Sequence, residues 1–204
     1  MKPVLEKRER SLGTKLSIKG ERCNSPKCAL VRKPNPPGSR SRKRFRKPKE
    51  FGLQMKEKQK MRFIYGLRDS QLRAVFIEAV REGRAGANGV LSLLERRIDN
   101  VVFRMGLAAS RSISRKLVSH GHFLVNGRRV TSPALILRQG DVIKVRPESA
   151  GNKYFTGIAE KLKGYEFPVW IKLDLGSLSG ELVGEPGDIE LPVDIGAVVD
   201  YYSK

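Results

Sequence analysis

Residues Leu94–Val145 read LERRIDNVVFRMGLAASRSISRKLVSHGHFLVNGRRVTSPALILRQGDVIKV, and the order of signals along this stretch decides the fold. The pattern predicts two short basic helices, then a hairpin at an Asn-Gly pair, and then a further strand. Helix signals followed by strand signals within one short segment indicate a compact α+β module.

The first helix of this stretch is expected to begin at Asn88, a residue suited to capping, and to end before Gly106. Its apolar residues recur at the spacing of one continuous helical face. They are Leu91, Leu94, Ile98, Val101, Val102 and Met105. We therefore expect a single helix over 88–105.

The second helix, RSISRKLVSHG, is expected to be capped by Ser110. Ile113 and Leu117 are i,i+4 neighbours and should form its buried side. Arg111 and Arg115 should then lie on the opposite side, where they contact a partner without stabilising the fold.

Strands are expected beyond this helix. Asn126-Gly127 suits a two-residue hairpin turn, because both positions need a positive φ. ALILRQGDVIKV should form a strand pair around residues 139–141. GIAEKLKG predicts a short helix, whereas PVWIKLDL and GELV predict strands.

The flanks differ in composition. LQMKEKQKMRFIYG and DSQLRAVFIEAVREG have helical periodicity, and DIGAVVDYYSK near the end is ambiguous between helix and strand. Residues 1–50 are rich in Lys, Arg, Pro and Gly and poor in large apolar groups. Such a segment is expected to be largely extended and to become ordered against its partner.

The charge of the chain indicates a polyanionic partner. Lys and Arg number 41 against 21 acids, a formal net charge of +20. Residues 1–62 carry net +16, residues 63–158 net +9 and residues 159–204 net −5. Neutralising phosphates releases condensed counterions, which favours nucleic-acid binding. The acidic tail is expected to pack internally or to meet a basic protein.

Other classes of protein fit less well. We expect no membrane partner, since no apolar run is long enough to span a bilayer, and no secretory signal, since MKPVLEKRER lacks an apolar core. Two cysteines do not form a disulfide framework, so a reducing cytoplasm is expected. No phosphate-binding loop or catalytic motif is visible, so we expect neither an enzyme nor a small-molecule substrate.

The quoted stretch supplies a basic surface that one RNA backbone could follow. RNA fits better than DNA, because no long recognition helix is available for a major groove. The residues on this surface are expected to be Arg96, Arg97, Asn100, Arg104, Ser110, Arg111, Arg115, Lys116, Arg128 and Arg129.

Three of these segments resemble the S-four RNA-binding domain: LERRIDNVVFRMG, SRSISRKLVSHGHFLVNGRRV and GDVIKV. The flanks KLSIKGERCNSPKCALVRKPNPPGSR, LQMKEKQKMRFIYGLRDSQLRAVF and LPVDIGAVVDYYSK resemble the bacterial-type small-subunit ribosomal protein S-four family. The resemblance covers nearly the whole chain, and its ordered motifs are specific.

This resemblance implies an α+β fold in which short helices pack on a small, mainly antiparallel sheet. It implies a basic arm over 1–50, a helical domain over 51–90 joined by the tail at about 187–204, and an S-four-type domain over 91–186. It also implies binding to a multi-helix junction in the 5′ domain of small-subunit ribosomal RNA, early in assembly. The expected neighbours are the S-five protein and messenger RNA where it enters the subunit, with an effect on decoding fidelity.

The expected RNA-binding set also includes residues outside the surface named above. These are Lys15, Lys19, Arg22, Arg32, Lys33, Arg40, Arg42, Lys43, Arg44, Arg46, Lys47, Lys56, Lys58, Lys60, Arg62, Tyr65, Arg68, Ser114, His120 and Asn126.

Zinc-binding members of the family carry two cysteine pairs. Here Cys23 and Cys28 match the second pair, while the first falls on Glu6 and Glu9. Structural zinc sites are usually built from Cys and His, so we expect no bound zinc and no other cofactor. His120 and His122 flank a helix end and are not expected to be catalytic.

Two alternatives share the RNA-binding module. A pseudouridine synthase would need a catalytic domain after it, and about fifty residues after Lys153 are too few. A stand-alone RNA regulator, including a repressor of its own messenger as in some family members, needs only the module.

Overall fold

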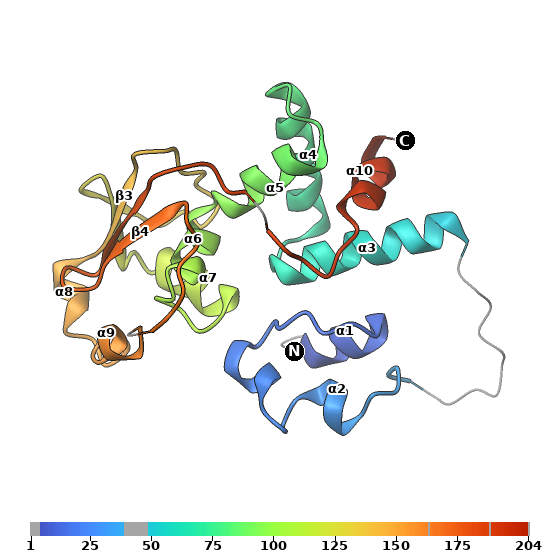
Figure 1. Cartoon of the computed structure of the whole chain (residues 1–204), viewed down its shortest axis with the longest axis horizontal. Coiled ribbons are helices and arrows are strands. Elements are labelled where there is room, and N and C mark those ends of the chain that lie inside the picture. The colour runs from blue at the N-terminus through green and yellow to red at the C-terminus, as the bar shows by residue number, and fades with distance from the viewer. Residues whose placement is uncertain (1–4, 39–48, 163, 188, 204) are drawn as a thin grey trace. The chain divides into compact units, whose positions relative to one another are not determined.

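The computed structural model describes residues 5–38, 49–162, 164–187 and 189–203 of the chain (Figure 1). It divides into two compact units. Unit 1 comprises Met1–Val90 with Glu190–Lys204, and unit 2 comprises Leu91–Ile189. Helices accompany one antiparallel sheet, so the predicted α+β class is confirmed. No helix in the described part of the chain is long and apolar enough to cross a membrane.

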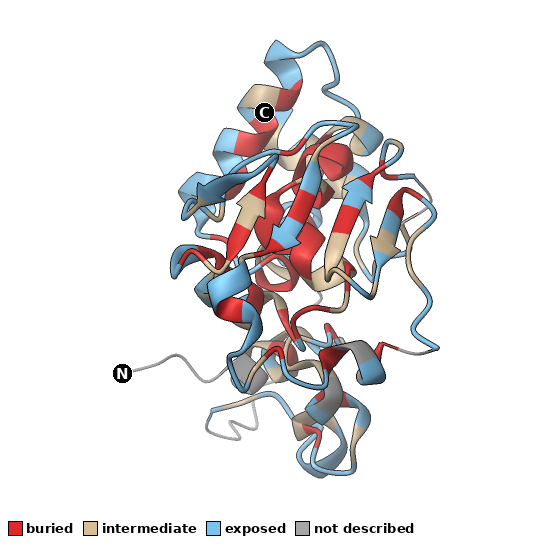
Figure 2. Ribbon diagram, turned by 90° about the vertical axis from the view of Figure 1, so that its left-hand side faces the viewer, coloured by how far each residue is buried: buried red, intermediate tan, exposed pale blue. Residues whose placement is uncertain are grey.

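Unit 2 contains a five-stranded sheet in the order β2-β1-β3-β5-β4, with every neighbouring pair antiparallel. Its strands are β1 Phe123–Val125, β2 Arg128–Val130, β3 Val142–Val145, β4 Ile171–Asp174 and β5 Ser179–Leu182. Burial alternates along β1, β3 and β5, as Figure 2 shows, so one face of the sheet supports the core.

The hairpin between β1 and β2 is confirmed. Asn126 and Gly127 have φ of +49° and +77°, and Val125 pairs with Arg128. The predicted strand pair around residues 139–141 is only half present, since β3 forms but its expected partner does not. The N–H of Arg138 bonds the Asp141 carboxylate at 2.7 Å instead of another strand.

The single helix expected over 88–105 is wrong. The structure has α5 Ala87–Glu95 and α6 Ile98–Arg104, with extended backbone at Arg97 between them. Arg97 forms an isolated bridge with Ile136, and the Ile98 N–H bonds the Leu135 carbonyl at 2.8 Å. This long-range pairing stops the helix, because it takes the backbone groups that a continuous helix would use.

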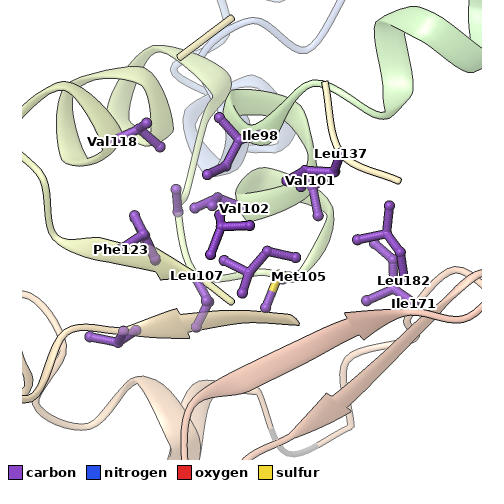
Figure 3. Close-up of a cluster of buried hydrophobic side chains, with 14 of the residues drawn as sticks. Ile98, Val101, Val102, Met105, Leu107, Val118, Phe123, Leu137, Ile171 and Leu182 are labelled. Atoms are coloured by element: carbon purple, nitrogen blue, oxygen red, sulfur yellow. The ribbon is translucent and has the colours of Figure 1, made fainter. Parts of the chain in front are cut away.

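The core of unit 2 lies between the sheet and helices α6 and α7 (Arg111–Ser119). Its members include Met105, Phe123 and Leu182, which are fully buried (Figure 3). The buried side of α7 is Ser114 and Val118, whereas Ile113 and Leu117 are only partly buried. The short helices α8 Pro147–Ala150 and α9 Ile158–Lys161 complete the unit, the latter as predicted.

Unit 1 contains the helices α3 Glu50–Ile64 and α4 Asp69–Arg81. The C-terminal helix α10 Ile195–Ser203 packs against both. Tyr201 stacks on Phe51 with ring centroids 5.6 Å apart, and Tyr202 lies 4.4 Å from Phe76. The ambiguous C-terminal segment is therefore a helix, and packing against α3 and α4 is one role of the acidic tail.

The N-terminal part of unit 1 differs from the extended arm that composition predicted. It contains α1 Leu5–Leu12, the 3-10 helix η1 Gly20–Asn24 and α2 Ala29–Arg32. A small core explains the difference, because Leu16, Cys23 and Cys28 are all buried there. A few well-placed apolar groups fold a segment whose average composition is strongly basic.

Candidate nucleic-acid interface

The candidate interface of unit 2 is built on α6 and α7. Ser110 caps α7, accepting the Ile113 N–H at 3.4 Å, and its own backbone is extended, as a cap residue requires. The Ser114 hydroxyl donates to the carbonyl of Asp99 in α6. These bonds fix the start of α7 against α6, so the side chains on the two helices share one surface.

Glu95, at the end of α5, organises half of this surface. Its carboxylate is fully buried and accepts the Arg104 Nε and Nη2 at 2.8 and 2.9 Å. Asn100 Nδ2 donates to it at 2.6 Å, and Arg111 Nη2 lies 3.9 Å away. A fully buried carboxylate is strongly destabilising unless it is paired and hydrogen-bonded, and here both conditions hold.

Arg111 is held from two further directions. Its Nε donates to the Asn100 side-chain oxygen at 2.6 Å, and its guanidinium lies 4.5 Å from the centre of the Phe103 ring. The stacking and the hydrogen bond together fix the plane of the guanidinium. Arg111 is therefore oriented by the fold as well as charged.

Asp99 organises the other half of the surface. Arg97 donates its Nε and Nη2 to the two carboxylate oxygens at 3.1 and 3.0 Å. Arg115, from α7, reaches Oδ2 of the same carboxylate with Nε at 2.9 Å and Nη2 at 2.5 Å. Four arginines and two acids thus form two neighbouring clusters, around Glu95 and Asp99, with a combined net charge of +2.

The hairpin extends this surface. Arg129 Nη2 donates to the carbonyl of His120, the residue that ends α7, at 3.3 Å. Gly121 allows this approach, because a Cβ there would lie 2.3 Å from Arg129 Nε. The side chain of Asn126 is used within the hairpin, bonding Asp141 and the Val142 N–H.

Unit 1 has a separate basic pocket of about 410 Å³. None of its described lining residues is acidic, and Arg10 is held there by two hydrogen bonds to the Asn35 carbonyl at 3.2 and 3.0 Å. The cations that line it are Lys7, Arg10, Arg22, Lys27, Arg32 and Lys33. Three of them, Lys7, Arg10 and Lys27, were missed from sequence because they come from different turns of a segment expected to be extended.

Lys58, in α3, is buried and structural. Its ammonium lies 2.9 Å from Asp69 and 3.2 Å from the Tyr201 hydroxyl, which joins three helices. Burial alone lowers the pKa of Lys58, but the hydrogen bonds to Asp69 and Tyr201 outweigh it, so its pKa is raised above 10.5. Lys58 is therefore charged but turned inward.

The structure sorts the predicted RNA-binding residues by accessibility. The exposed ones are Lys15, Arg22, Arg32, Lys33, Lys56, Arg68, Lys116, His120, Asn126, Arg128 and Arg129. The partly buried ones are Lys19, Lys60, Arg62, Arg96, Arg104, Arg111 and Arg115. The basic run of Arg40, Arg42, Lys43, Arg44, Arg46 and Lys47 lies outside the described residues.

Six predicted residues are buried, which differs from the expectation of direct contact. They are Lys58, Tyr65, Arg97, Asn100, Ser110 and Ser114. Helical periodicity placed Arg97 and Asn100 off the apolar stripe. In the structure both are buried and bonded to acids of unit 2, Arg97 to Asp99 and Asn100 to Glu95. The sequence analysis did not identify Glu95 and Asp99 as site residues. Their one sequence signal is that they flank the Arg96-Arg97 pair, Glu95 directly before it and Asp99 two residues after it.

The cysteines and Glu9 do not fit a zinc site. The Glu9 carboxylate is buried and one of its oxygens already accepts the N–H groups of Leu16 and Ile18, at 3.1 and 3.3 Å. Burial raises the pKa of the Cys23 thiol, which opposes the thiolate that zinc requires. Within the described ranges no three Cys, His, Asp or Glu side chains form a metal-binding group, and the Glu6 side chain lies outside them.

Of the two histidines, His122 packs within unit 2 and His120 is exposed. His122 Nδ1 lies 2.9 Å from the Ser149 hydroxyl, and its ring packs against Phe155. Burial, followed by the nearby His120, Arg146 and Arg129, lowers the pKa of His122 below 6.5. The shift favours the neutral ring, which bridges the start of β1 to α8.

Comparison with known proteins gives two matching family models. One, described as the S4 domain, matches residues 96–143, and the other, described as the ribosomal protein S4/S9 N-terminal domain, matches residues 5–95. Small ribosomal subunit protein uS4 of Thermus thermophilus is 43% identical over 94% of this chain and 93% of its own length. The proteins of that name from Caldicellulosiruptor bescii and Halothermothrix orenii are 45% and 42% identical over the same shares.

Proposed function

Because the chain belongs to the family of small ribosomal subunit protein uS4, and is thus a structural RNA-binding protein of that subunit, we propose that it clamps a junction of several helices in the 5′ domain of small-subunit ribosomal RNA. In this role it nucleates assembly of the domain. It also contributes to decoding fidelity together with a neighbouring ribosomal protein, for which the resemblance indicates S-five.

The observation that carries this proposal is the fixed arginine surface of α6 and α7. Arg104 and Arg115 are held at one edge by buried carboxylates, and Arg111 donates to the side-chain oxygen of buried Asn100, so their orientation is set before RNA arrives. Such a surface recognises where phosphates lie rather than which bases are present. Folded RNA junctions present phosphates at defined positions, which is the feature that this surface can recognise.

The basic pocket of unit 1 supports a second contact to the same RNA. It gathers six cations in one concavity, and their mutual repulsion is relieved when phosphates enter. Since both surfaces belong to one chain, binding at one raises the effective concentration at the other. A junction offers closely spaced backbone segments, so it suits two contacts better than a single duplex does.

The experiment that tests this function is a salt titration of binding to a transcript of the 5′ domain. If about 6–10 phosphates are contacted, affinity should fall by roughly 10³- to 10⁵-fold between about 50 and 200 mM salt. A transcript in which the junction is replaced by one continuous duplex is the control and should bind more weakly. An affinity that does not change with salt, or equal affinity for both transcripts, would contradict the proposal.

Sedimentation separates this role from that of a stand-alone regulator, whether of the protein's own messenger or of another RNA. A subunit protein migrates in stoichiometric amounts with small subunits. Migration mainly as free protein would instead favour the regulator.

We further propose that the protein acts without a cofactor and is not an enzyme. In the N-terminal core, Glu9 holds the loop by accepting the N–H groups of Leu16 and Ile18, so the core does not need a metal to hold it. Metal analysis of the purified protein should find no stoichiometric zinc, and a chelator should leave its thermal unfolding unchanged. One zinc per chain, lost in a Cys23→Ser variant, would overturn this proposal.

A further inference from the structure

The interface of unit 2 is a basic surface supported by buried negative charge. Glu95 is fully buried and Asp99 is 3% exposed, yet each lies directly beneath arginines of the candidate interface. An RNA-binding surface gains nothing from negative charge as such, because that charge repels phosphates. The presence of two acids there calls for a physical explanation.

We propose that Glu95 and Asp99 are positioning residues for RNA, so that RNA binding depends on two negative charges that RNA never touches. Glu95 holds Arg104 directly and Arg111 through Asn100, and Asp99 holds Arg115. This inference rests on the proposed function, because it concerns how the arginine surface of α6 and α7 binds RNA.

The geometry gives the reason. Glu95 takes the Nε and Nη2 edge of Arg104 in a two-point contact, and Asp99 takes the same edge of Arg115. A planar guanidinium bound at two points cannot rotate freely, so its remaining edge keeps a fixed direction. An unrestrained arginine would lose side-chain entropy on meeting phosphate, and that loss weakens binding.

Two physical effects at this surface predict opposite signs. If charge alone decides affinity, neutralising Glu95 removes a repulsion and RNA binds more tightly. If positioning decides, the same change releases Arg104 and Arg111, and RNA binds more weakly despite the higher net charge. The sign of the change in affinity therefore separates the two effects without depending on its size.

The experiment compares Glu95→Gln with wild-type protein on the 5′-domain transcript at several salt concentrations. We expect affinity to fall by roughly tenfold, the size of about one lost charge-assisted contact. Glu181→Gln makes the same charge change at an exposed position of β5, and should bind as wild type or slightly tighter. Binding by Glu95→Gln as tight as wild type, or tighter, would overturn the proposal.

Folding is checked by thermal unfolding of each variant. If Glu95→Gln fails to fold, Arg104→Lys replaces it, since this change keeps the charge and removes the two-point contact. Arg104→Lys should bind several-fold more weakly, and unchanged affinity would overturn the proposal. Failure of wild-type protein to bind in a salt-dependent way would instead refute the proposed function.

Discussion

The two units use buried carboxylates for opposite purposes. In unit 2, Glu95 and Asp99 hold arginine side chains and so fix the direction of positive charge at the surface. In unit 1, Glu9 holds backbone N–H groups and fixes the path of a loop, while the described residues that line the nearby pocket include six cations. In unit 2, buried acids fix the orientation of the surface arginines. In unit 1, the folded backbone gathers cations around one pocket.

This comparison shows why net charge is a poor guide to where RNA binds. The more basic region, residues 1–62, carries net +16, and within it the Glu9 carboxylate holds a loop through the backbone N–H groups of Leu16 and Ile18. The arginine network of unit 2 carries only +2 but is built into a packed core. Loss of a buried acid should therefore destabilise the protein more than loss of an exposed cation does.

The largest effect is expected for Glu95→Ala. This change leaves Arg104 and Asn100 without their buried partner, and breaking a buried ion pair typically costs about 3–5 kcal/mol. Urea unfolding followed by circular dichroism measures the loss. A cost below about 1 kcal/mol would mean that the network is not part of the structure of unit 2.

Glu9→Ala should cost about 2–6 kcal/mol, because two backbone N–H groups lose their acceptor at roughly 1–3 kcal/mol each. The loss should be confined to residues 5–38, which amide hydrogen exchange can localise. Faster exchange in unit 2 as well would break the contrast between the two units.

Arg115→Ala and Lys116→Ala form a matched pair, since each removes one cation from α7. Arg115 pairs with buried Asp99, so its loss should cost about 1–3 kcal/mol. Lys116 is exposed, and its loss should change stability by no more than about 0.5 kcal/mol. Both variants should bind RNA more weakly. Equal thermal stability of the two would show that Arg115 is not structural.

The smallest effect concerns the packing of α10 at high pH. Burial raises the pKa of Tyr202 from 10.0 to about 12, so the folded chain keeps a proton that the unfolded chain releases. The raised pKa of Lys58 acts in the same direction. Stability should be full below pH about 10 and should fall as the pH rises toward about 12.

Thermal unfolding at a series of alkaline pH values measures this loss. Tyr202→Phe should show a shallower fall than wild type, because the phenol no longer titrates. The same pH dependence in both proteins would remove Tyr202 from this explanation.

Local signals were predictable from sequence, and long-range pairing was not. The Asn126-Gly127 hairpin and the Ser110 cap follow from neighbouring residues alone, and both are present. The break between α5 and α6 depends on the pairing of Arg97 with Ile136, a residue far along the chain. Helix propensity summed over a short window of sequence cannot predict a pairing with a residue outside that window.

The same limit applies to the candidate site. Periodicity correctly placed Arg111 and Arg115 away from the apolar core, and therefore predicted that they were purely surface groups. Their partners, Asn100 and Asp99, come from another helix, and pairing across helices makes these arginines part of the structure. The N-terminal core was missed for a related reason, since average composition hides a few buried residues such as Leu16.

If the proposed function is correct, this chain by itself recognises the shape of a ribosomal RNA junction. Chemical probing of 5′-domain RNA with the purified protein, in the absence of other ribosomal proteins, tests this most directly. We expect protection of backbone positions clustered at one multi-helix junction, reduced in Glu95→Gln. Protection scattered along the RNA, or none at concentrations that saturate binding, would contradict it.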